Sequence, residues 1–213
     1  KSFDLAKRTT PELIELLGHG DKWHRQTALR LLGDRKDVSA LPALKKRLAG
    51  ALGQAALEAL WAVNLSGGFT PDFAGVTIGH ADPHVRLWTV RLLGDERVLT
   101  EPLAKRLARL AKREPHVEVR SQLAAMAKRL PAPQALPIIR ALMEHDSDAG
   151  DIYQPLMVWW ALESKVGQDA SEVFELFEDK SVWQKSLARQ HLLSRLIRRF
   201  AKAGTRADLI SGA

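Results

Sequence analysis

The chain has 213 residues, no cysteine, and a formal net charge of +7 at pH 7, and hydrophobic residues make up 46% of it. The absence of cysteine excludes disulfides, thiolate metal sites, a cysteine nucleophile and covalent haem attachment within these residues. No apolar run approaches the roughly 20 residues that a membrane-spanning helix needs, and we expect no membrane insertion. The positive charge suits an acidic protein surface, an anionic lipid surface or a nucleic acid, and it does not distinguish among them. Leu and Ala dominate the apolar residues and only six Phe and one Tyr are present, which favours helix over strand and predicts an all-α fold.

The first predicted elements form a helical hairpin. Thr10-Pro11 opens a helix, because proline suits the first helical position. Asp21 is expected to cap a second helix that runs from about Lys22 to Leu32. Gly33 is expected to end this second helix.

Two further hairpins follow. The second is expected to begin near Ser39-Ala40 and to stop at Ser66-Gly67-Gly68, where turn residues cluster. The third begins at Thr70-Pro71, and its short first helix, from Asp72 to Ile78, contains one glycine and two β-branched residues. Both hairpins show apolar residues at helical spacing.

Three more hairpins complete the predicted order. They open near Glu101-Pro102, Pro133-Gln134 and Ala170, and the first of them turns at Glu114-Pro115-His116. The acidic loop from Asp146 to Asp151 joins the two helices of the fifth hairpin. The sixth pairs a helix over 170–178 with a long basic helix from about Val182 to Lys202.

An internal repeat links these hairpins. Residues 18–34 return at 79–95 with nine of seventeen positions identical and no gap. The shared residues are a Gly-His-x-Asp turn, two arginines four and nine residues after the aspartate, and a Leu-Leu-Gly-Asp ending. In the fourth hairpin we expect Glu114 to replace the aspartate and Arg120 to be displaced by two inserted residues. Repeated helix pairs predict units that stack on one another.

The pairs Asp21/Arg25 and Asp82/Arg86 resemble the turn of HEAT repeats, including the PBS-lyase HEAT-like type. In that family the aspartate at the turn and the arginine of the second helix form hydrogen bonds along the stack. The resemblance implies an α-α superhelix, or HEAT-like solenoid, of about six helical hairpins. We therefore expect one continuous array over residues 1–213, excised from a longer multidomain protein. We assign structural roles in the repeat to five residues: Asp21, Arg25, Asp82, Arg86 and Arg120.

Three strings carry a narrower resemblance. They are the segment from Phe3 to His19 together with Trp23-His-Arg-Gln-Thr-Ala, the string Ala59-Leu-Trp-Ala-Val, and the string Trp159-Trp-Ala-Leu-Glu163. Together they are similar to the HEAT-repeat segment of large exported membrane-bound dehydrogenases of planctomycetes and verrucomicrobia. In that family the segment lies between a sugar-dehydrogenase-like propeller and a c-type cytochrome domain. The resemblance implies a periplasmic or exported docking scaffold within a redox protein, and it assigns no catalytic residue and no cofactor to these residues.

The tryptophans are the candidate partner-binding residues. All six fall on predicted second helices, which line the concave face of HEAT stacks. Neighbours on a helix point about 100° apart, so we expect Trp159 and Trp160 to differ in burial. Tryptophan often anchors interfaces. The candidate surface comprises Trp23, Trp61, Trp88, Trp159, Trp160 and Glu163.

Two groups of residues suggest cation sites, but a structural interpretation of each group is stronger. His80 and His84 have the spacing of two ligands on one helical face, but Pro83 and the turn position of His80 favour ordinary turn residues. The loop 146–151 resembles a fragment of a calcium loop, but it lacks the third carboxylate and the bidentate glutamate. A solvated loop between helices is the simpler interpretation, and we predict no metal site.

The last helix carries a dense positive stripe from Lys185 to Lys202. An amphipathic capping helix explains this stripe, because terminal repeats need a polar outer face. Nucleic-acid or lipid binding is the alternative interpretation of the same residues.

The sequence predicts a non-catalytic scaffold that binds a protein or adjoining domains of its own chain. No nucleophile and base signature, phosphate loop or complete metal set is present. The alternative is a nucleic-acid-binding protein of the HEAT-like DNA glycosylase type. Against it, many cations occupy first helices, expected on the convex side. A third possibility is a bilin-lyase-like protein with a chromophore cleft, and the sequence offers no test of it.

Overall fold

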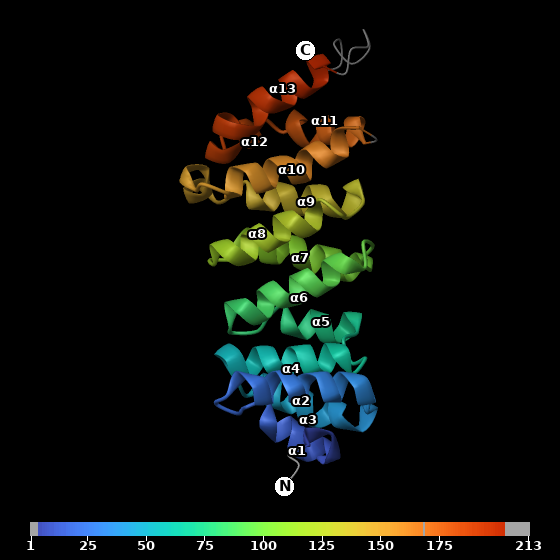
Figure 1. Cartoon of the computed structure of the whole chain (residues 1–213). Helices are drawn as coiled ribbons and strands as arrows, with labels where there is room; N and C mark the ends of the chain where they lie inside the picture. Colours follow the sequence, from blue (N-terminus) through green and yellow to red (C-terminus); the bar gives the residue numbers. More distant parts are fainter. Residues whose placement is uncertain (1–3, 168, 203–213) are drawn as a thin grey trace. The chain divides into compact units, whose positions relative to one another are not determined.

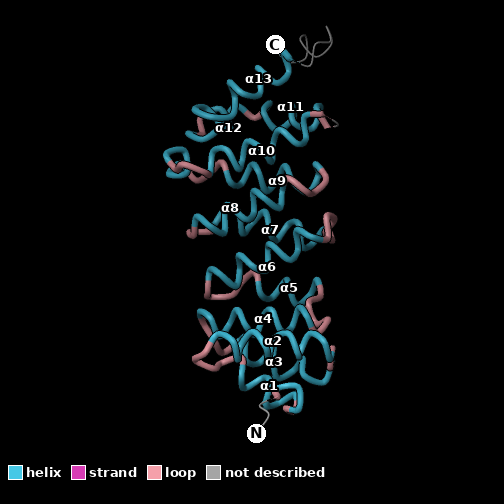
Figure 2. Tube along the Cα trace, in the orientation of Figure 1, coloured by secondary structure: helices cyan, strands magenta, loops and turns pink. Residues whose placement is uncertain are grey.

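The computed structural model describes residues 4–167 and 169–202. Over these residues the chain forms helices joined by turns and loops and contains no strand (Figure 2). The predicted all-α class is therefore confirmed. None of the described helices is long and apolar enough to cross a membrane. The parts of the expected array at 1–3, 168 and 203–213 lie outside the described residues.

The chain divides into two compact units, Lys1–Thr89 and Val90–Ala213. Helix α6 (Pro83–Asp95) contains the boundary. The expectation of one continuous array over the whole chain stays a prediction.

The first unit is built from paired helices. Helix α1 (Thr10–Leu16) packs on α2 (Lys22–Arg35), and α3 (Leu41–Ala49) packs on α4 (Gly53–Leu65), which also contacts α2 (Figure 1). Helix α5 (Pro71–Thr77) places Phe73 against this core. The core leucines Leu13, Leu17 and Leu44 are fully buried, and each contributes roughly 1.5–3 kcal/mol through the removal of apolar surface from water.

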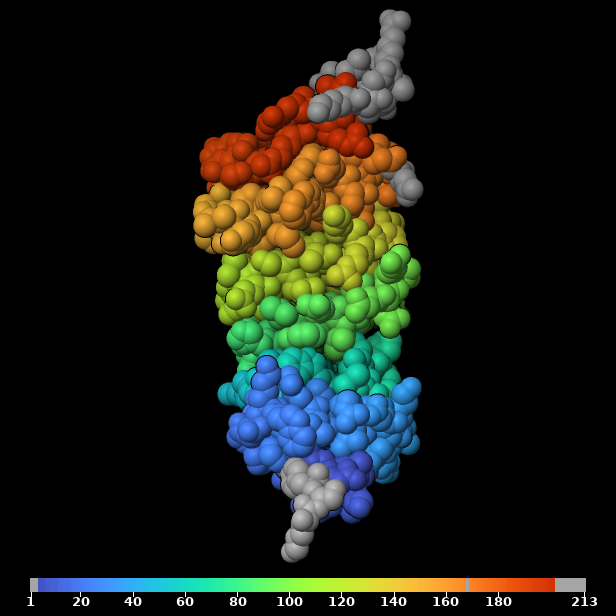
Figure 3. Space-filling view, viewed as in Figure 1, coloured from blue at the N-terminus to red at the C-terminus, as the bar shows by residue number. Residues whose placement is uncertain are grey.

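The second unit repeats this arrangement. Its helices are α7 (Glu101–Arg113), α8 (Val117–Ala127), α9 (Ala132–Leu142), α10 (Gln154–Val166), α11 (Ala170–Glu178), α12 (Lys180–Trp183) and α13 (Leu193–Lys202). Helix α9 packs against both α7 and α11, while α10 packs against α8 and against the π-helical segment Ala188–Leu192. Within this unit, consecutive segments of the chain form consecutive bands in the space-filling view (Figure 3). Helices α9 and α10 thus contact both the helices before them, α7 and α8, and the helix after them, α11.

The predicted helix starts are confirmed at three positions. The Thr9 hydroxyl and the Glu12 side chain form a reciprocal capping box at α1. Asp21 accepts the amide N–H of Trp23 at the start of α2, and Thr70 caps α5 in the same manner. These side chains bind amide groups that have no partner within the helix.

The prediction that Gly33 ends α2 is wrong. The helix continues to Arg35, and Lys36 follows in the left-handed conformation with φ 49°. A Cβ atom at Gly33 would lie 3.0 Å from Cβ of Leu65, so the glycine lets α2 and α4 approach closely. Gly94, its counterpart in the repeat, has the same role, because a Cβ there would lie 3.2 Å from Cγ of Met126.

The predicted helix from Val182 to Lys202 is interrupted. Helix α12 ends at Trp183, and the chain turns at Gln184 and Lys185 before the helix resumes. The amide N–H of Ser186 donates to the Asp146 carboxylate over 3.1 Å. The sequence missed this break because the acceptor lies forty residues away in the chain.

Candidate functional site: the inter-helix turns and the tryptophan surface

The two copies of the sequence repeat form the same turn. Nη1 of Arg25 donates to the carbonyl oxygens of His19 and Gly20, both at 2.9 Å. Nη1 of Arg86 donates to the carbonyl oxygens of His80 and Ala81 at 2.8 and 2.9 Å. In each copy the arginine ties the start of the second helix to the turn that precedes it.

The fourth hairpin contains this turn without an insertion. Nη1 of Arg120 donates to the carbonyl oxygens of Glu114 and Pro115 at 2.9 and 2.8 Å, which lie six and five residues before it, as in the other two turns. The expected two-residue displacement of Arg120 is therefore wrong. The residue four positions before Arg120 is His116, which occupies the N-cap position of α8. At the same position in the other turns, Asp21 and Asp82 accept the N–H of the residue two positions later.

Glu114 corresponds to the histidine of the other turns. Its Oε1 accepts the N–H of His116 at 3.0 Å, as Nδ1 of His19 accepts the N–H of Asp21 and Nδ1 of His80 accepts the N–H of Asp82. The expectation that Glu114 replaces the aspartate is also wrong. A carboxylate and an imidazole nitrogen can serve here equally because both are acceptors that lie within reach of the N–H two residues later.

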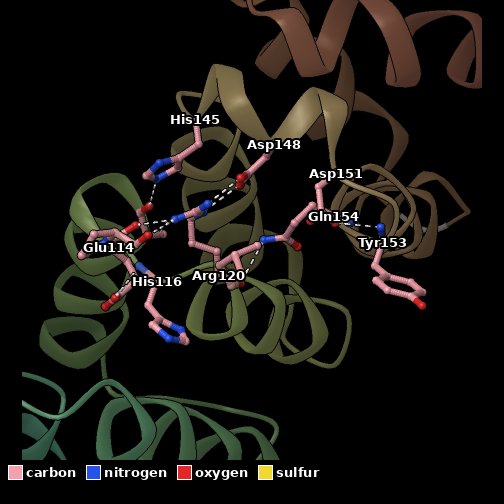
Figure 4. Close-up of polar contacts among 11 residues, drawn as sticks. Glu114, His116, Arg120, His145, Asp148, Asp151, Tyr153 and Gln154 are labelled. Carbon is pink, nitrogen blue, oxygen red and sulfur yellow. Dashed lines mark hydrogen bonds and ion pairs between the residues drawn. The ribbon is translucent and has the colours of Figure 1, made fainter.

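A buried ion pair connects the fourth and fifth hairpins (Figure 4). Nε of Arg120 donates to Oδ2 of Asp148 at 2.7 Å, and its Nη2 donates to Oδ1 at 2.5 Å. The side chains are 7% and 4% exposed. With the two turn carbonyls, Arg120 has four hydrogen bonds, so the cost of burying its charge is offset by well-placed acceptors.

The acidic loop is therefore not a simple solvated loop. Asp148 is buried, whereas Asp151 accepts the amide N–H groups of Tyr153 and Gln154, which lower the pKa of its carboxyl group. The amide of Ser186 lowers the pKa of Asp146. The carboxylates thus face different partners, and no group of three or more metal-ligating side chains occurs among the described residues.

Other polar contacts join successive hairpins within each unit. In the first unit, Nε2 of His80 lies 3.2 Å from the carbonyl oxygen of Leu48, and Nε of Arg25 donates to Oε1 of Glu58 at 3.3 Å. In the second, Nε2 of His145 lies 2.7 Å from the carbonyl oxygen of Ala111. Because Nδ1 of His80 accepts an N–H, its Nε2 carries the proton in the neutral ring. Both nitrogens of His80 are engaged.

The structure separates the candidate partner-binding residues. In the first unit, Trp23 is 55% exposed, while Trp61 and Trp88 are half-buried and pack edge to face with centroids 5.0 Å apart. In the second, Trp159 is buried and Trp160 is 43% exposed. The expected difference between these two neighbours is confirmed.

Charged side chains surround Trp160 and its helix. Nζ of Lys128 lies 5.8 Å from the centroid of the Trp160 ring, which is within the range of a cation–π contact. Glu163, one turn further along α10, lies 3.8 Å from Nε of Arg199. Trp183 belongs to the short helix α12, and its Nε1 donates to the carbonyl oxygen of Phe177.

Comparison with known proteins adds no relative. No protein-family model matches the chain, and no curated protein matches its sequence.

Proposed function

We propose that the chain is a HEAT-like α-solenoid scaffold that binds a protein or adjoining domains of its own chain and has no catalytic role itself. The observation that carries this proposal is the turn seen at Arg25, Arg86 and Arg120. In each copy, Nη1 of the arginine donates to the carbonyl oxygens of the residues six and five positions before it. Repetition of a purely structural contact is typical of stacked units. The packing of α9 between α7 and α11, and of α10 against α8, supports the same arrangement in the second unit.

The surfaces of α8 and α10 suit a protein partner better than a DNA duplex. In the second unit, the cations of α8 and α10 are already used, since Arg120 pairs with Asp148 and Lys165 donates to the carbonyl oxygens of Lys128 and Leu130. DNA binding depends on cations that neutralise phosphates. Trp160 remains exposed on this surface and suits an interface anchor.

Photocrosslinking tests this proposal. A benzoylphenylalanine at position 160 should crosslink a protein partner in an extract of the source cells, and the same group at Val38, an exposed residue before α3, serves as the control. The partner, once identified and purified, should bind the unmodified chain, and Trp160→Ala should weaken binding at least about tenfold, or 1.4 kcal/mol. Tight, steeply salt-dependent binding of a 20-base-pair duplex at physiological salt would instead favour the nucleic-acid function.

We also propose that the scaffold belongs to an exported redox protein, which the narrower resemblance supports through the strings at 3–19, 23–28, 59–63 and 159–163. Mass spectrometry of periplasmic and cytoplasmic fractions provides the test. Peptides of this chain should occur in the periplasmic fraction, in a polypeptide that also carries a Cys-x-x-Cys-His haem peptide. Peptides confined to the cytoplasm would contradict it.

A further inference from the structure

Helix α7 presents a cationic face to solvent. Its exposed positions include five basic residues: Lys105, Arg106, Arg109, Lys112 and Arg113. The opposite face buries Leu103, Leu107 and Ala111 in the core of the second unit. The basic residues are therefore confined to one side of the helix.

The charges on this face repel one another. Arg109 has a cation at each of its four helical neighbour positions, three and four residues before and after it: Lys105, Arg106, Lys112 and Arg113. Like charges at these spacings destabilise a helix. The positive charge in the last turn is favourable for the helix dipole, but this does not account for Arg106 and Arg109. The cluster is therefore not arranged to stabilise α7.

Most of these cations are not used by the fold. Lys105 pairs with Glu101 at 2.5 Å. Within the part of the chain that the structure describes, the other four, here called the α7 cations, form no ion pair: Arg106, Arg109, Lys112 and Arg113. Two other arginines of the second unit do have carboxylate partners, Arg129 in Asp95 and Arg140 in Asp179.

The dimensions and surroundings of the face indicate its partner. The α7 cations extend over about 10 Å of helix with roughly 5–6 Å between neighbours, which matches the spacing of carboxylates on one face of an acidic helix. On the adjacent helix α9 the exposed residues include Pro133 and Pro137. Neither α7 nor α9 contains an aromatic residue, so this face lacks the stacking platform typical of single-stranded nucleic-acid sites.

We propose that the exposed face of α7 binds an acidic segment of a protein partner. This inference rests on the proposed scaffold function, and it adds the helix that is used and the charge of the partner. The α7 cations attract and orient the segment, and the binding is correspondingly salt-sensitive.

Fluorescence anisotropy with the full chain tests the proposal. The probe is a fluorescein-labelled helical peptide that carries four glutamates at three- and four-residue spacing, titrated at about 50 and 150 mM salt. The α7 variant combines R106Q, R109Q, K112Q and R113Q. The control variant combines K7Q, K22Q, K46Q and K180Q, four exposed positions outside α7 that form no ion pair among the described residues. Each variant lowers the net charge from +7 by four, to +3, so the two differ only in where the charge is lost.

We expect the α7 variant to lose at least about tenfold in affinity and the control variant less than about threefold. Circular dichroism and urea unfolding should show that both variants fold like the parent chain. Equal losses in the two variants would show an effect of net charge alone and overturn the proposal, as would no binding of the peptide at 50 mM salt. Tighter binding of a 20-base-pair duplex that requires the α7 cations would assign the face to nucleic acid and also overturn it.

These outcomes are separate from a failure of the proposed function. A partner that binds through Trp160 and is insensitive to the α7 variant would leave the scaffold function in place and remove this inference. Loss of peptide binding in the α7 variant, with no partner crosslinked at position 160, would leave this inference in place and remove the proposed binding through Trp160.

Discussion

Removal of the charge of Asp148 should strongly destabilise the second unit. The substitution Asp148→Asn keeps the shape of the side chain and one acceptor, but it leaves the Arg120 guanidinium buried without a counter-charge. The two side chains are 7% and 4% exposed, so water cannot replace the lost carboxylate. Breaking one partner of a buried ion pair costs about 3–5 kcal/mol. Because asparagine retains one acceptor, we expect a loss of about 3 kcal/mol in the free energy of unfolding.

Urea unfolding followed by circular dichroism measures this loss. For a slope of about 2 kcal/mol/M, the midpoint of the transition that contains the second unit should fall by about 1.5 M. Asp95→Asn is the matched control, because Nη1 of Arg129 lies 2.7 Å from an aspartate oxygen, Oδ1 of Asp95. That pair is 42% and 66% exposed, so water solvates the arginine after the substitution and the midpoint should change little.

A double substitution separates the charge from the packing. In Arg120→Met with Asp148→Leu, no unpaired charge remains in the interior, and part of the stability lost in Asp148→Asn should return. Equal midpoints for Asp148→Asn and Asp95→Asn, or a loss below about 1 kcal/mol for Asp148→Asn, would contradict the conclusion that burial makes the Arg120–Asp148 pair important.

Three further predictions concern the acid range, the repeat glycines and a buried lysine. Hydrogen bonds from backbone and side-chain donors lower the pKa of Glu12 from 4.5 to about 2 and that of Asp179 from 3.8 to about 2. The two carboxylates therefore stabilise the fold fully above their unfolded-state pKa values, and this stabilisation is lost as the pH falls toward 2. In an acid titration followed by circular dichroism, Glu12→Gln or Asp179→Asn should reduce the pH dependence between pH 4.5 and 2, and an unchanged profile would contradict this assignment. Gly33→Ala should destabilise the chain by about 1–2 kcal/mol in urea unfolding, because the new Cβ meets the Cβ of Leu65. Gly94→Ala should be nearly neutral, because the flexible Met126 side chain can move and alanine favours helix. A larger loss of stability for Gly94→Ala than for Gly33→Ala would contradict this explanation. Burial lowers the pKa of Lys165 below 10.5, so its contribution to stability rises with pH between its folded-state pKa and 10.5. Lys165→Met should remove that rise. It should also speed amide hydrogen exchange in the last turn of α8, because Lys165 donates to the carbonyl oxygens of Lys128 and Leu130 directly after this helix.

The repeat also shows where reasoning from sequence identity fails. Alignment by residue type placed Glu114 opposite the turn aspartates, since both are acids. The structure aligns Glu114 with His19 and His80 because the shared property is an acceptor for the N–H two residues later. The position of the arginine relative to the turn carbonyls was the better guide to register, and counting back from Arg120 would have found it.

The sequence by itself determined the helices and the site candidates that depend on local spacing. Proline and capping residues predicted the starts of α1, α2 and α5, because these signals act within one helical turn. The adjacency of Trp159 and Trp160 predicted that one is buried and the other exposed, because helix geometry alone turns them apart.

Only the tertiary structure decided which residues meet across hairpins. The partner of Arg120 is an aspartate 28 residues away, in a loop whose composition suggested solvent exposure. Gly33 lies within α2, where Leu65 of α4 packs against it, and the last helix breaks where Ser186 binds Asp146. Such contacts depend on how far each helix shifts and rotates against its neighbour, and this is set by side-chain packing over the whole interface.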